Sequence, residues 1–291
     1  MINTINNWIL KIKKHQFLFE ELVKRDFKKK YKRTILGMLW SLLSPLMTLL
    51  VMSIVFTKFF GRNMPHYTIY LFSGNLVFNF FRESTYGGMN SLMSNSNIIT
   101  KINLPKYIFL LSKNVASLIN FALTLVIFFL FAAIDHVPFS IRFISLIYPI
   151  ACLILFNIGV GFILSALFVI FKDIQYLYEI FTMLLMYLSA IFYTTSEYSE
   201  IAQKAFYLNP LYVYITYFRH VVLDGYIPGI ATHFLCLFYC LAALGLVSAF
   251  TLFFTSPPSK MSKFLSREVH LPKREVRLII FWAIISPSSA L

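Results

Sequence analysis

The sequence predicts an all-α integral membrane protein with six membrane-spanning helices. Of its 291 residues, 58% are hydrophobic and only 13% are charged, a balance that is typical of membrane proteins rather than of soluble domains. A spanning helix needs about 20 mostly apolar residues. Six apolar runs, one of them short, approach this length and cover residues 35–60, 67–81, 107–134, 143–171, 176–193 and 230–254.

The positions of Lys and Arg predict the orientation, because loops rich in positive charge stay on the cytoplasmic side. Residues 1–34 hold ten of the 26 basic residues. An even number of spans places this segment on the same side as loop 82–106, loop 172–175 and the basic tail 255–291, which together hold ten more. Four lie in the segments on the other side: Arg62, Arg142, Lys204 and Arg219. We therefore expect both ends of the chain in the cytoplasm.

The N-terminal segment 1–34 is predicted to contain an amphipathic helix at the cytoplasmic membrane surface. Seven basic residues occur within residues 24–33. The apolar residues near them recur at helical spacing on one stripe: Phe19, Leu22, Val23, Phe27 and Tyr31. Such a helix is attracted by anionic lipid as well as by apolar burial. Nucleic-acid binding is a poor explanation of the charge, since no recognition fold or basic-aromatic module accompanies it.

Two residues mark the entry to the first predicted span. Gly37 predicts a turn into it, and Pro45 predicts an irregularity within it.

The segment between the second and third spans, residues 82–106, is polar with scattered apolar residues and closes at Pro105. Met89, Leu92 and Met93 can form one face of a short helix, with residues 94–97 capping or interrupting it. A plain solvated loop is the alternative interpretation.

The segment 194–229 predicts a pair of short helices on the outer side. A polar helical stretch near 196–207 precedes a break at Asn209-Pro210, where Asn is a good helix cap and Pro suits the first helical turn. The following stretch, 211–223, has 13 residues and a helical length of about 20 Å, too short for an apolar core of about 30 Å. We expect a re-entrant hairpin, with a surface amphipathic pair as the alternative.

Ionisable side chains are sparse within the predicted spans. Lys113 and Glu179 lie inside them, and Glu83 lies at the edge of the second. Proton- or ion-coupled transporters usually need buried carboxylates or His. This scarcity argues against a secondary transporter.

No catalytic, metal or nucleotide motif emerges. None of the six histidines has a carboxylate or cysteine at a spacing typical of a metal site or a catalytic set. No further metal-ligating residue lies near the three cysteines in the sequence. The chain contains no G-x-x-x-x-G-K-[ST] phosphate loop. We expect no metal or cofactor on this chain, so that any nucleotide energy must come from another subunit.

A resemblance narrows this interpretation. The stretch RDFKKKYKRTILGMLWSLLSPL resembles the N-terminal signature of membrane permeases of type-2 ABC exporters for O-antigen, capsule or teichoic acid chains. The positions that match are Arg25, Asp26, Tyr31, Thr34, Leu36, Gly37, Leu39, Trp40 and Pro45. NSLMSNSNIITKINLPKY, FKDIQYL and YLNPLY continue the likeness over about residues 15–255, whereas the tail 255–291 is longer than the family's usual short basic tail.

The resemblance implies a multi-pass permease of the bacterial cytoplasmic membrane that exports a lipid-linked polysaccharide. It implies a homodimer beside two copies of a cytoplasmic ABC ATPase, which binds ATP and Mg. In such a permease the interface helix would include Arg25, Asp26 and Tyr31. The segment that docks on the ATPase would include Ser94, Asn95, Asn97, Ile98, Ile99 and Lys101.

Aromatic side chains are candidates for lining the path of the sugar chain. The sequence contains 32 Phe and 17 Tyr, and their flat faces suit sugar rings, although lipid contact must account for most of them. We select residues on the first and fifth predicted spans, which we expect to face the dimer axis: Trp40, Phe56, Phe59, Tyr187, Phe192 and Tyr193.

Other functions remain open at this point. An ABC exporter of a drug or a lipid would share the architecture. A membrane glycosyl- or acyltransferase would need acidic or His residues clustered at one membrane face, and the sparse carboxylates argue against it.

Overall fold

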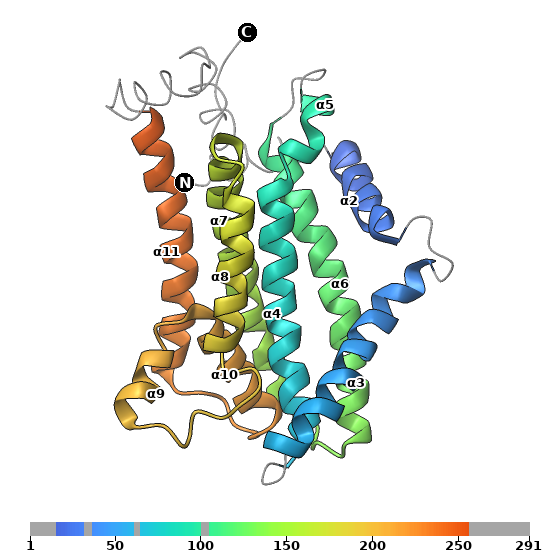
Figure 1. Ribbon diagram of the computed structural model, residues 1–291, viewed down its shortest axis with the longest axis vertical. Helices are drawn as coiled ribbons and strands as arrows, with labels where there is room; N and C mark the ends of the chain where they lie inside the picture. Colours follow the sequence, from blue (N-terminus) through green and yellow to red (C-terminus); the bar gives the residue numbers. More distant parts are fainter. Residues whose placement is uncertain (1–15, 32–36, 61–64, 100–104, 256–291) are drawn as a thin grey trace.

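The computed structural model describes residues 16–31, 37–60, 65–99 and 105–255. In these ranges the protein contains helices and no strand, so the all-α prediction is confirmed. The helices form an elongated bundle, with α2 and α5 at one end and α9 and α10 at the other (Figure 1). They are α2 Gln16–Tyr31, η1 Gly37–Leu39, α3 Trp40–Phe60, α4 Tyr67–Asn90, η2 Met93–Asn95, α5 Ser96–Ile99, α6 Tyr107–Ile134, η3 Ile141–Leu146, α7 Ile147–Ile170, α8 Ile174–Leu188, α9 Glu200–Phe206, α10 Pro210–Val222 and α11 Ile230–Thr255.

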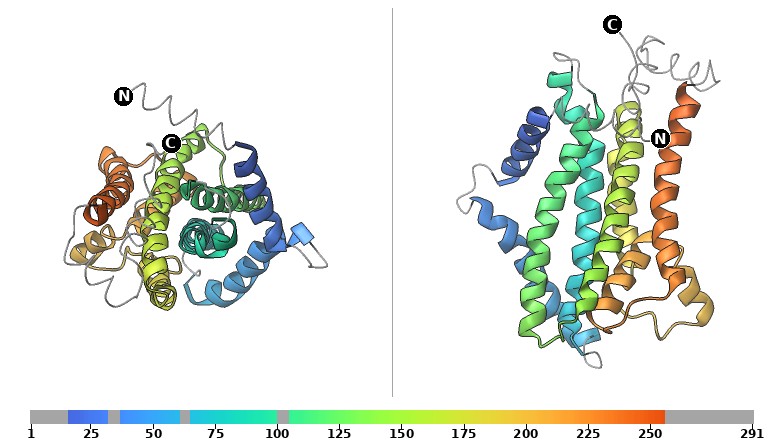
Figure 2. Two further views of the ribbon diagram at one scale, coloured as in Figure 1. Left: turned by 90° about the horizontal axis from the view of Figure 1, so that it is seen from above. Right: turned by 180° about the vertical axis from the view of Figure 1, so that it is seen from behind.

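Three helical segments in the described part are long and apolar enough to cross a membrane: Tyr107–Ile134, Ile141–Ile170 and Ile230–Ala249. Shorter apolar helices occur at Leu43–Phe56 and Ile174–Leu188. Helices α4 and α7 occupy the middle of the bundle, while α2 and α3 lie on one flank and α11 on the opposite flank (Figure 2).

Helix α4 extends beyond the apolar run 67–81 and ends only at Asn90. Its second half is polar in sequence, yet Ser84 and Thr85 are fully buried. The hydroxyl of Ser84 bonds to Asn114 of α6, and the hydroxyl of Thr85 lies 2.5 Å from that of Tyr178 of α8. Neighbouring helices therefore satisfy the polar side chains that would otherwise end the helix. The interpretation of this stretch as a solvated loop is wrong for residues 82–90.

Helix α8 ends at Leu188, five residues before the end of the predicted run 176–193. Ala190 has a left-handed backbone with φ 49°, which a continuous right-handed helix does not allow. The irregular backbone beyond α8 is buried and its carbonyl groups accept bonds from α4: the hydroxyl of Tyr67 donates to the oxygen of Phe192 at 2.7 Å. These bonds replace the missing helical ones.

Helix α10 begins as the sequence predicts. The amide of Leu211 donates to the side chain of Asn209 at 3.0 Å, and Pro210 occupies the first helical position. Nearly every side chain of α10 is buried against α4, α7, α11 and η3. The alternative of a surface amphipathic pair is therefore wrong for this helix.

Arg219 of α10 is buried in contact with α4 and the segment after α8. Its guanidinium donates to the carbonyl oxygens of Ala190 at 2.9 Å, Ile191 at 3.1 Å and Tyr70 at 3.2 Å, and to the hydroxyl of Ser73 at 3.3 Å. It also lies 3.4 Å from the centre of the Tyr70 ring. We call these five residues the Arg219 clamp.

Helix α2 packs along α6 through the predicted apolar stripe. Leu22 is buried against Ile108 and Phe109, with Leu18 and Phe19 beside them. The stripe therefore contacts protein and is not left for lipid alone. Gly37 adopts φ +51° before α3, which matches the predicted turn, and Pro45 lies within α3.

Candidate functional site

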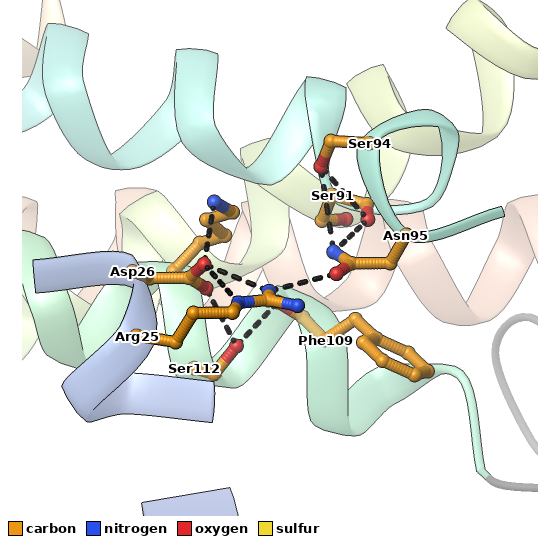
Figure 3. A network of polar contacts seen from close by, with 8 residues as sticks. Arg25, Asp26, Ser91, Ser94, Asn95, Phe109 and Ser112 are labelled. Atoms are coloured by element: carbon orange, nitrogen blue, oxygen red, sulfur yellow. Dashed lines mark hydrogen bonds and ion pairs between the residues drawn. The ribbon is translucent and has the colours of Figure 1, made fainter. Parts of the chain in front are cut away.

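A polar network joins three segments at the end of the bundle that carries α2 (Figure 3). Arg25 and Asp26 come from α2, Asn95 from η2, and Ser112 and Lys113 from α6. Arg25 Nη2 donates to Asn95 Oδ1 at 2.7 Å and to Asp26 Oδ1 at 2.8 Å. Lys113 Nζ lies 3.0 Å from Asp26 Oδ1, and Ser112 Oγ donates to Asp26 Oδ2 at 3.3 Å. We call these five residues the Asp26 network.

The Asp26 carboxylate is the buried centre of this network. Its side chain is 2% exposed, whereas those of Lys113 and Arg25 are 20% and 39% exposed. A buried carboxylate requires opposite charge and hydrogen-bond donors, and here two cations and a hydroxyl supply them. The network is therefore electrostatically matched at its centre and open to water at its edge.

Asn95 connects this network to the end of α4. Its oxygen accepts from Arg25, while its Nδ2 donates to the carbonyl oxygen of Ser91 at 2.7 Å. Both the acceptor oxygen and the donor nitrogen of this buried amide are hydrogen-bonded, which fixes the orientation of the Asn95 side chain. A displacement of η2 must therefore change the contacts of α2 and α4 together.

The remaining residues of the predicted coupling segment surround Asn95. The hydroxyl of Ser94 donates to Ser91 O at 3.4 Å. Ile98 and Ile99 of α5 pack against Leu22 and Phe109. The side chain of Asn97 is exposed. The predicted residue Lys101 and the side chain of Tyr31 lie outside the described part of the chain.

The side chains of two lysines near this end have shifted pKa values. The hydrogen bond and charge of Glu21 raise the pKa of Lys24 on the exposed face of α2. Burial lowers the pKa of Lys106, just before α6, because desolvation disfavours its charged form.

A groove with a cavity volume of about 1010 Å³ lies between α3, α4, α6 and α8. Trp40, one of the predicted lining residues, forms part of its wall. Its ionisable lining includes Arg82, Glu83 and Glu179, and Asn120 Nδ2 donates to Glu83 Oε1 at 2.6 Å. The groove is therefore a polar and aromatic surface within a largely apolar bundle.

Four other predicted lining residues come together outside this groove. The ring of Phe192 stacks on Phe56 with centroids 4.7 Å apart and lies 6.1 Å from Tyr187, whose carbonyl oxygen accepts from the hydroxyl of Tyr193 at 2.8 Å. Phe192 and Tyr193 do not lie on the fifth helix as predicted, because α8 ends before the left-handed Ala190. Phe192 is buried, and the side chain of Phe59 lies outside the description.

Several residues of these sites were not selected from the sequence. Arg219 was counted as an ordinary basic residue of an outer segment, although it is buried. Lys113 carried a usable signal, because a cation within an apolar run calls for a partner of opposite charge. Asn75, Asn79 and Ser117 of the groove carried no local signal.

The comparisons with known proteins agree on one family. The family model described as "ABC-2 type transporter" matches residues 18–223. The O-antigen export system permease protein RfbA of Myxococcus xanthus is 26% identical over 216 residues, which cover 72% of this chain and 82% of the relative. The protein of the same name from Klebsiella pneumoniae is 27% identical over 213 residues, with the same coverage. The polysialic acid transport protein KpsM of Escherichia coli is 21% identical over 223 residues, which cover 75% of this chain and 86% of the relative.

Proposed function

Because the chain belongs to the ABC-2 type transporter family, we propose that it is the membrane permease of an ATP-driven exporter of lipid-linked polysaccharide in the bacterial cytoplasmic membrane. Relatives that carry the names O-antigen export permease and polysialic acid transport protein support this cargo class. The sequence has no phosphate-binding loop. ATP and Mg therefore bind to a partner ABC ATPase, present in two copies.

The Asp26 network is the observation that carries the proposed coupling to the ATPase. The partner docks on the coupling segment Ser94, Asn95, Asn97, Ile98, Ile99 and Lys101. Closure of the ATPases pushes on η2 and α5. Arg25 receives this displacement through Asn95 Oδ1, and Asp26 passes it to Lys113 and Ser112 of α6. Ile98 and Ile99 also pack against the cluster that contains Leu22 of α2 and Phe109 of α6. A displacement of α5 therefore reaches both helices through apolar contacts as well.

A second copy of the chain is proposed to pack along α3 and α8. Helix α8 has 15 residues, about 22 Å of helix, which is shorter than an apolar core of about 30 Å. Only Tyr178 and Thr182 of α8 are buried. The exposed side carries Glu179, and a carboxylate facing lipid is costly. This side of α8 therefore faces a polar path at the axis of a homodimer.

The path of the sugar chain is proposed to follow this axis. Trp40 contributes to the groove, and Phe56, Tyr187, Phe192 and Tyr193 form an aromatic cluster nearer the α10 end. Phe59 belongs to α3 and is kept as a candidate of this path. The aromatic faces let successive sugars slide without a fixed hydrogen-bond partner.

The proposed topology has six spans and cytoplasmic ends. Helix α2 lies at the inner surface, where its basic residues attract anionic lipid. Asn209 and Pro210 start α10, which enters from the outer side and returns as a re-entrant hairpin. The burial of α10 by α4, α7 and α11 supports this, because short helices at membrane depth need protein around them.

The coupling assignment is tested in proteoliposomes that contain the permease and its partner ATPase. Replacing residues 94–101 by a Gly/Ser linker should abolish the coupling of ATP hydrolysis to export. Asn95→Leu should reduce this coupling strongly, because it removes the acceptor for Arg25. Asn90→Leu changes the same residue type at the exposed end of α4 and serves as the control. Unchanged coupling in the linker variant would remove the docking assignment.

The path assignment has a separate test. Tyr187→Ala and Phe192→Ala should slow export of the polysaccharide without reducing assembly with the ATPase, which is measured by co-purification. Normal export by both variants would exclude these two residues from the path.

A further inference from the structure

We infer that Tyr178 of α8 is a positioning residue: through its hydroxyl contact with Thr85 of α4, helix α8 follows displacements of the coupling end of the bundle. The inference rests on the proposed function for the existence of coupling and of a path beside α8. It adds a route from the coupling segment to α8, separate from the route through the Asp26 network to α6.

Helix α8 is joined to the rest of the chain through a non-helical residue at each end. Phe171, between α7 and α8, has an extended backbone with φ −125° and ψ 101°. At the other end, the left-handed Ala190 follows α8, and its carbonyl oxygen accepts from Arg219 at 2.9 Å. A few residues at helix ends can absorb the φ and ψ changes of a hinge motion. Without a further contact, α8 is therefore free to pivot about the Arg219 clamp when the bundle moves.

Tyr178 supplies this further contact, near the end of α8 that is remote from the clamp. Its side chain is 5% exposed, whereas most of α8 is exposed. Its hydroxyl oxygen lies 2.5 Å from Thr85 Oγ1 and 3.3 Å from the carbonyl oxygen of Arg82. Its ring packs with Met89 of α4 and Phe168 of α7. Because a buried hydroxyl that loses its partner is costly, the contact fixes α8 against α4 at this point.

Thr85 belongs to the half of α4 that leads to the coupling segment. Asn95 of that segment donates to the carbonyl oxygen of Ser91, the residue directly after α4, at 2.7 Å. Only about 9 Å of helix separates Ser91 from Thr85, since each residue adds about 1.5 Å. A rigid helix carries a displacement over such a length. Motion of η2 therefore reaches Thr85 along α4 and Tyr178 across the hydroxyl contact.

Helices α4, α7 and α11 pack against one another more closely than they hold α8. A Cβ atom at Gly88 of α4 would lie 3.0 Å from the Cα atom of Gly161 of α7. One at Gly159 of α7 would lie 2.9 Å from the Cβ atom of Ala243 of α11. Backbones in such close approach interlock and resist sliding. The three helices therefore move as one unit, and α8 follows this unit through Tyr178.

The hydroxyl contact is tested by conservative substitutions in proteoliposomes that contain the partner ATPase. Tyr178→Phe and Thr85→Val each remove one hydroxyl and keep the buried shape. Each should lower the amount of polysaccharide exported per ATP hydrolysed about fivefold, the factor that corresponds to one lost hydrogen bond. The double variant should be no worse than either single variant, because all three lack the same contact.

Tyr148→Phe is the matched control for these variants. The hydroxyl of Tyr148 donates to the carbonyl oxygen of His233 at 2.8 Å and so joins α7 to α11. The substitution removes a hydrogen bond of the same kind, but between two helices that already interlock. Export per ATP should therefore stay normal.

A distance measurement separates the positioning of α8 from a purely structural role of Tyr178. Leu184→Cys places one spin label on an exposed part of α8 outside the groove. The three native cysteines are buried, so the reagent labels the introduced thiol. In the homodimer with its ATPase in lipid nanodiscs, trapping with ATP and vanadate should change the distance between the two labels. The change should disappear with Tyr178→Phe and persist with Tyr148→Phe.

Four results overturn the inference. The label distance does not change in the unmodified protein, it changes equally with Tyr178→Phe, both hydroxyl variants export normally, or their effects on export add in the double variant. If Tyr178→Phe does not assemble with the ATPase, Thr85→Val decides through both readouts.

These results are distinguishable from failure of the proposed function. The distance measurement needs no polysaccharide, so a different cargo leaves it intact. Lost coupling in the 94–101 linker variant, together with normal coupling in both hydroxyl variants, removes only this inference. Normal coupling in the linker variant, together with lost coupling in both hydroxyl variants, removes only the docking assignment.

Discussion

The Asp26 network and the Arg219 clamp both hold charge inside the bundle, but they neutralise it differently. In the network, one buried carboxylate contacts the side chains of Arg25 and Lys113. In the clamp, a buried guanidinium contacts carbonyl oxygens, the hydroxyl of Ser73 and the ring of Tyr70, with no carboxylate within salt-bridge distance in the described structure.

This difference indicates different mechanical roles. The network is built from flexible side chains on three separate segments, and Arg25 is partly exposed, so its bonds can exchange with water when the segments move. The clamp binds backbone oxygens of Ala190 and Ile191, which holds the left-handed break after α8 in one geometry. We therefore expect the α2 end to transmit motion and the α10 end to resist it.

The largest loss of stability is expected for Arg219→Met. It removes the guanidinium donors to the carbonyl oxygens of Ala190, Ile191 and Tyr70, so these buried oxygens lose their charged partner. The free energy of unfolding should fall by about 4 kcal/mol, the scale of breaking a buried charged contact. Unfolding in mixed micelles measures this. Arg142→Met is the control, since Arg142 is an exposed arginine whose side chain bonds, within the described residues, only to Gly225 O. An equal loss there would contradict the special role of the clamp.

Asp26→Asn should have the next largest effect. It places the cations of Arg25 and Lys113 together without the carboxylate between them, which should lower the free energy of unfolding by about 3 kcal/mol and reduce the coupling of ATP hydrolysis to export. Adding Lys113→Met should restore part of this stability, because one unmatched cation disappears. A double-mutant cycle measures this interaction. Purely additive losses would show that Asp26 and Lys113 are not energetically coupled.

Gly74→Ala tests how closely the clamp is packed. A Cβ atom at this position would lie 2.7 Å from Arg219 Nη2 and 3.4 Å from the backbone of Ile191. The guanidinium must shift and lengthen its bonds, at a cost of about 2 kcal/mol in the free energy of unfolding. Gly87→Ala lies on the same helix, where a Cβ atom meets only ordinary contacts. That variant should be neutral or slightly stabilising in the same unfolding assay; similar losses at both positions would exclude a specific clash with Arg219.

Lys24→Ala should have the smallest effect, although Lys24 forms an ion pair with Glu21 at 2.9 Å on the same helix as Asp26. Both side chains are exposed, and such pairs contribute little in water. Stability and ATPase coupling should be indistinguishable from those of the unmodified protein. A clear loss of coupling would extend the functional surface of α2 beyond the Asp26 network.

Local patterns in the sequence were sufficient for part of the fold. The apolar run 107–134 has the same bounds as α6, and Asn209-Pro210 starts α10 where predicted. Gly37 adopts the left-handed backbone expected of a turn before α3. Each of these features depends on neighbours in the chain: the length of an apolar run, a capping side chain, or the backbone freedom of glycine.

The sequence also placed Arg25, Asp26 and Asn95 among the candidate residues, but through resemblance to a family and in two separate groups. Their contact, and the partnership with Lys113, required residues about 70 to 90 positions apart to meet. The six path candidates were likewise chosen by their place along the chain. Of the candidates whose side chains the structure describes, Trp40 lies in the groove. The others form the aromatic cluster outside it: Phe56, Tyr187, Phe192 and Tyr193.

By itself, the sequence therefore determined the helical membrane character, the cap of α10 and the basic asymmetry, because hydrophobicity, capping and charge are properties of short segments. Only the tertiary structure decided that α4 continues through Ser84 and Thr85, that α8 stops at Leu188, and that Arg219 is buried. The physical reason is common to all three. A polar group can enter the interior only where a distant residue completes its hydrogen bonds, and a single sequence does not show which distant residue that is.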